Sequence, residues 1–389
     1  MKHTALALIG SLIALNCAFV HPAWNGISES EMTNTGRIAG HPIERIFHYD
    51  NSPVGGQRFW PGIMYQDRRG RYWLGTWQKA NASVLCYEEP AGTWTVFGSE
   101  LIGTQTTLHH NPDAIIPAEV GSICEDRFGT IWFCRQRSTP RSRDNHIAVS
   151  AYDGTKWYGT DLNLDLNSLV GVDMGIFRTP NGTVWLWYGN RLVSLSIDRK
   201  STAIPLGQEV LVPPAYNRPY TPAEISSGLG DIFCAAADRD GYIWVTRATG
   251  VLRYDVEKRE WARYPEVKVR ATSIFQDTSG RMWFASSGKI AVFDSKTQQT
   301  IIHSIEDEIP AGKRPDFVYI QTLFRDRGGN VLIGLSEGLL SFNEYDSQWR
   351  FIDPREIGLD KDVANISEDN KGRIWILTHR GIAILAPSN

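Results

Sequence analysis

Seven related turns recur along the chain, and the residues seven positions before them include side chains that could bind a ligand or transfer protons. These positions hold Trp60, Glu119, Val172, Asp231, Arg270, Tyr319 and Asp362. The carboxylates could act as acid, base or calcium ligands, and the arginine could pair with a carboxylate or a sulfate. The residues three positions before the turns are all apolar: Met64, Ile123, Ile176, Ala235, Ile274, Leu323 and Ile366. This contrast predicts a functional polar mouth above a packed wall, although simple solvation of strand ends would produce the same contrast.

A second set of side chains stands three residues after the tryptophan position of each turn. It comprises Thr76, Arg135, Tyr188, Arg247, Ser286, Leu335 and Thr378, and Trp77 and His379 follow directly after two of them. Aromatic rings stack on sugar rings, and arginine binds acidic groups, so Trp60, Trp77 and Trp187 with these arginines predict an acidic glycan ligand. The alternative is that arginine and tryptophan pack the loops against each other, with Trp187 in the core.

The turns that define these positions follow the pattern D-x-x-G-x-x-W. They are DRRGRYW (67–73), DRFGTIW (126–132), TPNGTVW (179–185), DRDGYIW (238–244), DTSGRMW (277–283), DRGGNVL (326–332) and DNKGRIW (369–375). The third turn lacks the aspartate and the sixth lacks the tryptophan. The turn glycines are 39 to 59 residues apart. A period near 50 with short strands is typical of β-propeller blades.

Each repeat is expected to supply one blade of four antiparallel strands. An apolar strand such as 272–276 ends at the aspartate, which can cap the turn, and the glycine can adopt a positive φ. A second strand carries the tryptophan, and a third and a fourth strand follow, as in 290–294 and 300–305. The six repeat tryptophans and the fourth-strand Trp94, Trp157, Trp261 and Trp349 are therefore expected in the core.

The last repeat ends after its third strand at 381–386, so its fourth strand must come from elsewhere. Segment 44–50 (ERIFHYD) resembles a fourth strand and precedes the first repeat. We expect it to complete the last blade and remove the exposed edges. The prediction is an all-β, seven-bladed propeller: a signal peptide at 1–23, a flexible lead-in at 24–43, and one propeller domain at 44–389.

The repeats resemble the two-component-regulator propeller family, whose unit is an acidic-x-x-G-x-(I/L)-W-x-G-T turn followed by G-L-x-x-(Y/F)-D. The segments that carry the resemblance are 238–255, 67–77 and 326–343. The resemblance implies a sensor-type propeller, since members are typically periplasmic halves of hybrid histidine kinases, many thought to read glycans. No sandwich domain, membrane helix or kinase follows the repeats here, so signalling by this chain alone is not expected. The layout is also similar to streptogramin-lyase propellers, but the chain has no E-x-H or H-x-H sequence.

Two faces with different connections follow from four-stranded blades. The first-to-second and third-to-fourth connections are short and share one face. The other connections are long and irregular, at 98–118, 135–147, 206–228, 305–316 and 353–361. Long loops on a rigid scaffold commonly bind ligands, so this is the predicted binding face. Its predicted ligand-binding residues are Trp60, Trp77, Glu119, Arg135, Tyr188, Asp231, Arg247, Arg270, Tyr319, Asp362 and His379, with no catalytic residue and no metal ligand.

The N-terminus predicts export. Lys2 and His3 precede an apolar run at 5–20, which is typical of a secretory signal and too short for a convincing membrane span. Cleavage is expected after Ala18 or Ala23, and lipid attachment at Cys17 is the less favoured alternative. The mature protein would be periplasmic or secreted.

Charge and cysteine spacing exclude several classes of function. A formal net charge of −3 predicts no general attraction to nucleic acid. Cys86, Cys124, Cys134 and Cys234 lack C-x-x-C spacing and are expected as buried thiols, although Cys124 and Cys134 could pair. We expect no cofactor.

Three functions remain open from the sequence. The first is a non-catalytic exported propeller that binds a glycan or another extracellular ligand. The second is a polysaccharide lyase or hydrolase, in which Tyr319, Tyr188, His379 and Arg270 would supply a base and neutralise a uronate. The third is a scaffold that binds other envelope proteins through its long loops.

Overall fold

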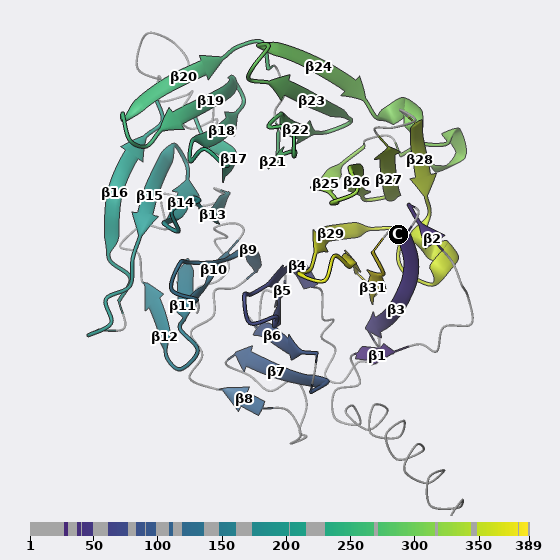
Figure 1. Cartoon of the computed structure of the whole chain (residues 1–389), viewed down its shortest axis with the longest axis horizontal. Coiled ribbons are helices and arrows are strands. Elements are labelled where there is room, and N and C mark those ends of the chain that lie inside the picture. Colours follow the sequence, from purple (N-terminus) through teal and green to yellow (C-terminus); the bar gives the residue numbers. More distant parts are fainter. Residues whose placement is uncertain are drawn as a thin grey trace, which may run out of the picture.

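A computed structural model describes most of the chain as an all-β ring (Figure 1). The described residues are 27–29, 37–39, 41–49, 61–76, 83–89, 91–98, 109–111, 119–135, 148–160, 173–201, 203–214, 230–267, 271–315, 318–343, 348–379 and 381–387. Within these ranges the helical elements are three short 3-10 turns: η1 (Glu306–Glu308), η2 (Ala311–Lys313) and η3 (Pro354–Ile357). None of the described helices has the length and apolar character needed to cross a membrane.

Seven antiparallel blades surround the centre of the ring, as the sequence predicts. Blade 1 contains β4 (Pro61–Gln66), β5 (Tyr72–Thr76), β6 (Ser83–Glu88) and β7 (Thr93–Gly98), and β8 (His109–Asn111) adds to β7 in parallel. Blade 2 contains β9 (Val120–Glu125), β10 (Ile131–Arg135), β11 (Val149–Tyr152) and β12 (Trp157–Thr160). Blade 3 contains β13 (Met174–Arg178), β14 (Val184–Tyr188), β15 (Arg191–Leu195) and β16 (Leu206–Leu211).

The other blades repeat this order. Blade 4 contains β17 (Ile232–Ala237), β18 (Ile243–Arg247), β19 (Gly250–Asp255) and β20 (Glu260–Tyr264). Blade 5 contains β21 (Ser273–Gln276), β22 (Met282–Ser286), β23 (Lys289–Asp294) and β24 (Gln299–Ser304). Blade 6 contains β25 (Ile320–Arg325), β26 (Asn330–Leu335), β27 (Gly338–Asn343) and β28 (Gln348–Ile352). Blade 7 contains β29 (Val363–Glu368), β30 (Ile374–Thr378) and β31 (Gly381–Leu385). The first strand of each blade is innermost, and these seven strands contact their neighbours in a closed circle.

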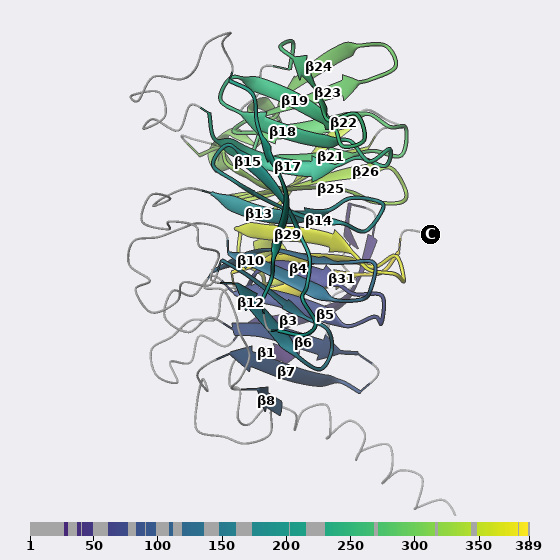
Figure 2. The same cartoon turned by 90° about the vertical axis from the view of Figure 1, so that its left-hand side faces the viewer.

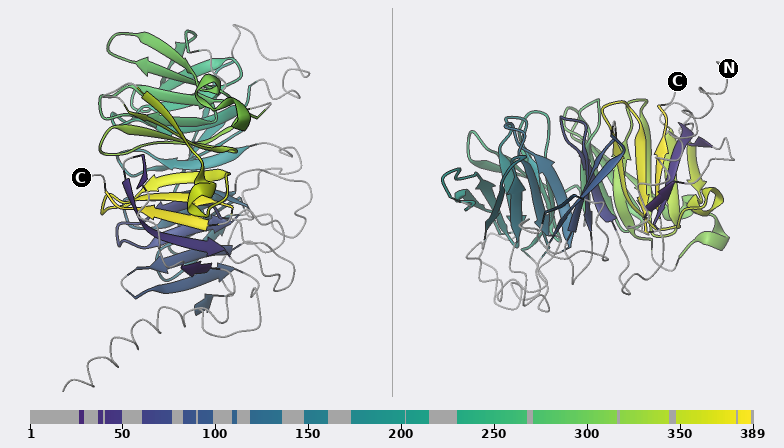
Figure 3. Two further views of the ribbon diagram at one scale, coloured as in Figure 1. Left: turned by 90° about the vertical axis from the view of Figure 1, so that its right-hand side faces the viewer. Right: turned by 90° about the horizontal axis from the view of Figure 1, so that it is seen from below.

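The N-terminal strand closes the ring, which confirms the predicted closure. β3 (His41–Tyr49) pairs with β31 as the fourth strand of blade 7, and Figure 3 shows the two strands side by side. β3 begins three residues before the segment 44–50 that was expected from the sequence. The short strands β1 (Ile27–Glu29) and β2 (Arg37–Ile38) pair with β3 in turn. Parts of the segment expected to be a loose lead-in therefore extend the last blade.

One element of blade 3 corrects a sequence-based expectation. Residues 206–228 were expected to form a long loop, but Leu206–Leu211 pairs with β15 as the fourth strand. This strand lacks the aromatic pair that marks several other fourth strands, and its burial alternates weakly because it lies at the outer edge. Residues 215–229 lie outside the described residues.

The cores between blades contain the tryptophans that the repeats place there. Trp73, Trp132, Trp185, Trp244, Trp283 and Trp375 are each at most 2% exposed. Among the fourth-strand residues, Trp157 is buried, Trp261 and Trp349 are partly buried against the core, and the side chain of Trp94 lies outside the description. Six of the seven apolar wall positions are buried as well, and Ile274 is partly buried.

The aspartate of each turn joins the turn to its tryptophan. In blade 5, Oδ1 of Asp277 accepts hydrogen bonds from the amides of Ser279 and Arg281, both at 2.9 Å. Its Oδ2 accepts one from Nε1 of Trp283 at 3.0 Å. The same tryptophan bond occurs in blades 1, 2, 4 and 7, at 2.7 to 3.1 Å. All seven turn glycines have φ between 79° and 91°, a conformation that favours glycine. The spacing of Asp, Gly and Trp therefore reflects one hydrogen-bonded unit.

Blade 3 lacks this link because Thr179 stands where the other turns have aspartate. Asn181 accepts the amide of Thr183 instead, at 3.0 Å. Within the described part of the chain, Nε1 of Trp185 is buried without a hydrogen-bond partner. A buried donor in this state costs stability.

We expect the substitution Thr179→Asp to stabilise the protein by about 1 kcal/mol, because the new carboxylate would accept the buried Trp185 N–H. A thermal melt should show a midpoint about 2 °C higher than that of the wild type. The control is the same substitution in a Trp185→Phe background, where the gain should vanish. A gain that persists in this background would show that the indole N–H is not its cause.

Blade 6 lacks the tryptophan, and His41 of the closing strand β3 contacts the turn aspartate instead. Leu332 occupies the tryptophan position, and Nε2 of His41 lies 2.9 Å from Oδ2 of the turn Asp326. Nδ1 of His41 lies 3.0 Å from the carbonyl oxygen of Ala386. Both neighbours are acceptors, so both ring nitrogens can donate only when the imidazole is protonated. His41 thus connects the N-terminal strand to blade 6 as well as to blade 7.

We expect this contact to lose its stabilising effect as the pH rises. Burial lowers the pKa of His41, but the hydrogen bonds to Asp326 and Ala386 raise it more, so the net pKa is above 6.5. Such a group stabilises the fold fully below its unfolded pKa, and the contribution disappears as the pH rises through the folded pKa. Denaturant unfolding of wild type and His41→Gln should therefore give a free-energy difference that is largest below about pH 6.5 and shrinks above it. A difference that is independent of pH would contradict the protonated pair.

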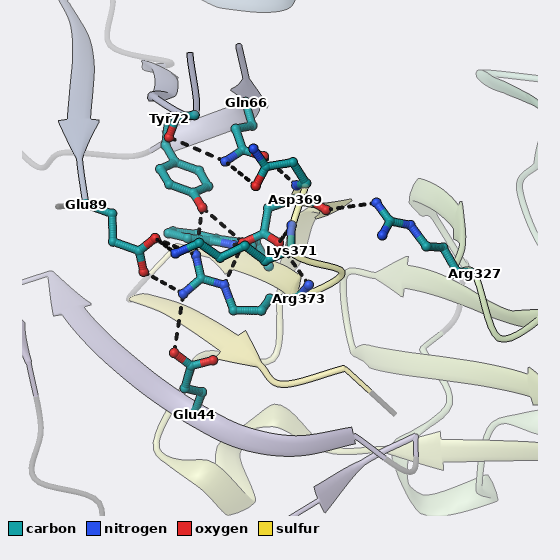
Figure 4. A network of polar contacts seen from close by, with 11 residues as sticks. Glu44, Gln66, Tyr72, Glu89, Arg327, Asp369, Lys371 and Arg373 are labelled. Carbon is teal, nitrogen blue, oxygen red and sulfur yellow. Dashed lines mark hydrogen bonds and ion pairs between the residues drawn. The ribbon is translucent and has the colours of Figure 1, made fainter. Parts of the chain in front are cut away.

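A second closure network joins blade 7, blade 1 and β3 around Arg373 (Figure 4). The Nε of Arg373 donates to Asp369 at 2.7 Å, and its guanidinium also contacts Glu89, Tyr72 and Glu44. Glu89 and Tyr72 belong to blade 1 and Glu44 to β3, so one buried arginine connects the first and last parts of the ring.

The cysteines are free thiols that serve packing. Cys86, Cys124 and Cys134 are buried and Cys234 is partly buried. Cys124 lies opposite Trp132 and Cys134 opposite Ser122 in the β9–β10 ladder, so the two thiols do not pair. Burial raises the pKa of Cys86, Cys134 and Cys234 to about 12, which keeps them protonated and poorly reactive near neutral pH.

Candidate functional site

The two faces of the disc, seen edge-on in Figure 2, differ in the connections that they carry. The D-x-x-G turns and the third-to-fourth strand turns lie on one face, which we call the turn face. The other connections leave the strands at the opposite face, which we call the loop face. The mouth is the set of residues at the start of the innermost strands on the loop face. It includes Glu119, Asp231, Tyr319 and Asp362, which stand seven residues before their turns and lie directly before or near the start of the innermost strands.

The pairing of the innermost strands is irregular at this mouth. A register shift occurs near the start of the strand in blades 1, 2, 4, 6 and 7. The shifts fall at Pro61/Ile63, Val120/Ser122, Ile232/Cys234, Ile320/Thr322 and Val363/Asn365. A bulge leaves one residue unpaired and redirects its side chain, and bulges are common beside functional sites. In blade 6 the residue in the bulge is Gln321.

Gln321 bonds to a carboxylate of blade 7, which in turn contacts a histidine of the same blade. Its side-chain amide donates to Oδ1 of Asp362, the residue directly before β29. Oδ2 of Asp362 lies 3.0 Å from Nδ1 of His379, which follows β30. The side chains of His379 and Asp362 are 27% and 22% exposed, whereas Nε2 of His379 is itself buried. The hydrogen bond to Asp362 is the main cause of the raised pKa of His379, although burial opposes it. An imidazole held in this way donates through Nδ1 to Asp362, and it could exchange a proton with a ligand only if the groups that bury Nε2 moved aside.

Beside this cluster lie an exposed aromatic side chain, Tyr319, and an ion pair that holds the neighbouring segment in place. Tyr319, two residues before Gln321, is 46% exposed. Lys361, next to Asp362, donates to both carboxylate oxygens of Glu337 in the β26–β27 connection, at 2.6 and 2.7 Å. This ion pair holds the segment before β29 against blade 6. An accessible aromatic ring thus lies on the same rim as the Gln321–Asp362–His379 cluster.

The described part of the mouth is rich in carboxylates. Asp231 lies before β17, where burial raises its pKa and the neighbouring carboxylate of Asp173 raises it further. Glu119 lies before β9 with a φ of +53°. In the described ranges, no three acidic, histidine or cysteine side chains converge as ligands for a metal ion.

Three of the predicted ligand-binding residues are buried. Arg135 and Arg247 are each 2% exposed, and Tyr188 is 5% exposed. Burial lowers the pKa of Arg135, and the nearby Glu119 carboxylate opposes this effect. A guanidinium nitrogen of Arg247 donates to the carbonyl oxygen of Pro213 just after β16. In this structure these side chains support the loop face from below and do not form its surface.

The remaining predicted binding residues are three that the structure does not describe and one tryptophan that lies in the core. Trp60, Trp77 and Arg270 lie outside the described residues. Trp187 is 8% exposed and packs in the core between blades 3 and 4, directly over Gly175. The interpretation of Trp187 as a sugar-stacking residue is therefore wrong, and its alternative, a core residue, is correct.

Two residues of the mouth were missed by the sequence reasoning. Gln321 was not predicted, because counting seven residues back from each turn assumes regular strand pairing. The bulge in β25 instead turns this side chain toward Asp362. Asp173 occupies the position before β13 that the rule assigns to Val172, one residue earlier. Its acidic neighbour in the next blade, Asp231, was predicted, so a search for carboxylates within one residue of the expected position could have found Asp173.

Comparisons with known proteins agree with the fold and do not identify the function. No family model matches the sequence, and no curated protein matches it. Among solved structures, an extracellular domain assigned to a one component system of B. thetaiotaomicron is similar with a TM-score of 0.55 and 16% identity, over 87% of this chain and 39% of that chain. This chain therefore spans about two-fifths of that structure.

Two further structures show how widely the fold is shared. A catalytically inactive virginiamycin B lyase from Staphylococcus aureus, solved with quinupristin, gives a TM-score of 0.57 at 14% identity, covering 92% of this chain and 98% of that one. A chain of the mitotic checkpoint complex gives 0.56 at 8% identity, covering 92% and 99%. These proteins differ in function but share the architecture. The chain is a seven-bladed β-propeller, the fold that its resemblance to sensor propellers implies.

Proposed function

We propose that this protein is an exported, non-catalytic propeller that binds an extracellular glycan at the mouth of its loop face. The observation that carries the proposal is the Gln321–Asp362–His379 cluster beside the exposed ring of Tyr319. Sugar hydroxyls bond to carboxylate, imidazole and amide groups, and the apolar face of a sugar ring stacks on an aromatic side chain. The three residues of the cluster come from three separate elements, which the ring brings together at one rim.

The charged side chains described at the mouth favour a neutral glycan, which binds through its hydroxyl groups, over an acidic glycan. The mouth carries Glu119, Asp173, Asp231 and Asp362, which would repel an anionic group. Arg135 and Arg247, on which the expectation of an acidic glycan partly rests, are buried. Arg270, which was also expected to bind an acidic sugar, lies outside the described residues. We therefore rank neutral glycans ahead of acidic ones in the test.

A thermal-shift screen against neutral and acidic oligosaccharides tests the proposal. A ligand at about 100 times its dissociation constant adds about 2.7 kcal/mol to stability, which moves the midpoint by a few degrees. Asp362→Asn should weaken binding by about tenfold or more, because the amide cannot replace both accepted hydrogen bonds. Glu257→Gln, a carboxylate change on the turn face, is the matched control and should bind like the wild type. No shift with any sugar, or equal loss in both variants, would refute glycan binding at this mouth.

The Asp362–His379 pair also favours a second candidate, a polysaccharide lyase. A carboxylate that orients an imidazole is a common arrangement for a general base, and a lyase removes a proton next to a uronate carboxylate. The screen should therefore include polyuronides, with absorbance followed for new unsaturated products. Turnover that disappears in His379→Gln would establish the enzyme and overturn the non-catalytic proposal.

Export is proposed on the sequence of residues 1–23, which lie outside the described residues. Determination of the N-terminus of the protein recovered from producing cells tests it. A start after Ala18 or Ala23 would support a cleaved signal, and a lipid-modified Cys17 would support anchoring. An intact Met1 would contradict export through a cleaved signal.

A further inference from the structure

The turn face carries a basic patch around an exposed phenylalanine, far from the mouth in the fold. Phe128, in the turn of blade 2, is 67% exposed, the highest value among the large apolar side chains of the described residues. The guanidinium carbon of Arg127 lies 4.7 Å from the centre of its ring, and that of Arg199 lies 5.9 Å from it. We define the Phe128 patch as Arg69, Arg127, Phe128, Lys156, Arg199 and Lys200.

The patch is continuous across three blades. Arg69, in the turn of blade 1, lies against Gly154 in the β11–β12 turn of blade 2, with a guanidinium nitrogen 3.5 Å from the position that a Cβ would take. Lys156, in that same turn, donates to the carbonyl oxygen of Ser201 at 3.3 Å. Ser201 belongs to the β15–β16 turn of blade 3, which also carries Arg199 and Lys200. Five cationic side chains therefore follow a connected path on one face.

The acidic groups near the patch are occupied by internal hydrogen bonds. Asp153 accepts bonds from the amides of Thr155 and Lys156 and from the hydroxyl of Tyr158. Asp198 accepts from the amide of Lys200 and the hydroxyl of Ser201. The turn residues Asp67 and Asp126, and Glu125 beside them, are buried. Within the described part of the chain, none of the five cations of the patch forms an ion pair with a carboxylate. Asp153 and Asp198 keep their negative charge, but the five cations outnumber these two carboxylates and leave the patch net positive.

We propose that the Phe128 patch docks the protein on an anionic phospholipid surface, with the turn face toward the membrane. The turns that carry these residues lie on one face of the disc (Figure 2), so several cations can approach a charged surface together. Each lysine or arginine near an anionic membrane adds to the attraction, and an aromatic ring enters the headgroup region favourably. A soluble polyanion would use the cations but leave the ring of Phe128 in water. In this orientation the mouth faces away from the membrane, so the inference is independent of what the mouth binds.

Co-sedimentation with vesicles tests this surface. The protein is mixed with vesicles of phosphatidylcholine alone or with phosphatidylglycerol added, and the ratio of the two binding constants is measured. The double variant Arg199→Glu, Lys200→Glu should bind anionic vesicles at least about twentyfold more weakly. Phe128→Ser should weaken binding to the same vesicles by about fivefold. Thermal melts of each variant check that the fold is intact.

A matched control lies in the next blade. Lys258 and Arg259 occupy the β19–β20 turn of blade 4, the equivalent of the turn that carries Arg199 and Lys200, and Lys258 is 69% exposed. The double variant Lys258→Glu, Arg259→Glu makes the same change in net charge and should retain most of the binding. Equal losses in the two double variants would overturn the proposal, because only net charge would matter. Binding to a soluble polyanion that is as tight as to vesicles and insensitive to Phe128→Ser would overturn it in favour of a polymer ligand.

Discussion

Replacing Arg373 with methionine should lower the free energy of unfolding by about 3 to 5 kcal/mol. The side chain is 6% exposed, and it contacts Asp369, Glu89 and Tyr72 in the network of Figure 4. Burial lowers the pKa of this arginine, but the hydrogen bonds to Glu89 and Asp369 raise it well above its usual value. Methionine conserves much of the volume but leaves the buried Asp369 without the Arg373 guanidinium, while Glu89 keeps its ion pair with Lys371. Removal of one partner from a buried ion pair is far costlier than absence of the whole pair.

The repeat supplies a matched control for this prediction. Arg71 holds the same position in blade 1, where its Nε donates to Asp67 at 2.7 Å and its side chain is 17% exposed. It does not connect the two ends of the chain. Arg71→Met should therefore cost about 1.5 to 2 kcal/mol, the lower part of the range for one hydrogen bond to a charged group, because the Arg71 side chain keeps some access to water. Urea unfolding of both variants measures the difference, and equal costs would show that Arg373 has no special role in closing the ring.

Much of the propeller could be predicted because every blade repeats the same local signals. The aspartate and glycine define a turn that needs only neighbouring residues, and the tryptophan six residues after the aspartate bonds back to it. These are short-range interactions, so they leave a pattern that is visible in the sequence. The closing strand was also predictable, because a ring with three strands in its last blade needs a fourth.

The details that escaped prediction depend on residues far apart in the chain. His41 replaces a missing tryptophan across 285 positions, and no local pattern marks this exchange. At the mouth, Gln321, Asp362 and His379 belong to three elements, and their meeting depends on a bulge in β25. The burial of Arg135 and Arg247 likewise depends on tertiary contacts, such as the hydrogen bond from Arg247 to the carbonyl oxygen of Pro213. The residue types at these positions suggested ligand binding, but the packing of the folded chain determines which of the side chains a ligand can reach.

The second large effect is expected from Asp277→Ala, which should destabilise the protein by about 3 to 4 kcal/mol. Asp277 is fully buried and accepts two backbone amides, the Arg281 guanidinium and the Trp283 indole. Burial raises the pKa of this carboxyl, but the bonds from Trp283 and Arg281 lower it more, so the charged form is held in the folded state. Alanine would leave these donors without their acceptor in the blade core.

Blade 3 is the natural comparison for that loss. Its turn already lacks the carboxylate, and the indole of Trp185 is buried without a partner among the described residues. Thr179→Ala should therefore cost less than about 1 kcal/mol, because it removes one hydroxyl and strands no indole N–H that was previously bonded. Denaturant melts of the two alanine variants, read at the same pH, measure the worth of the aspartate in its turn. If Thr179→Ala proved as costly as Asp277→Ala, the turn backbone would be the source of stability, and the link from aspartate to tryptophan would be incidental to the fold.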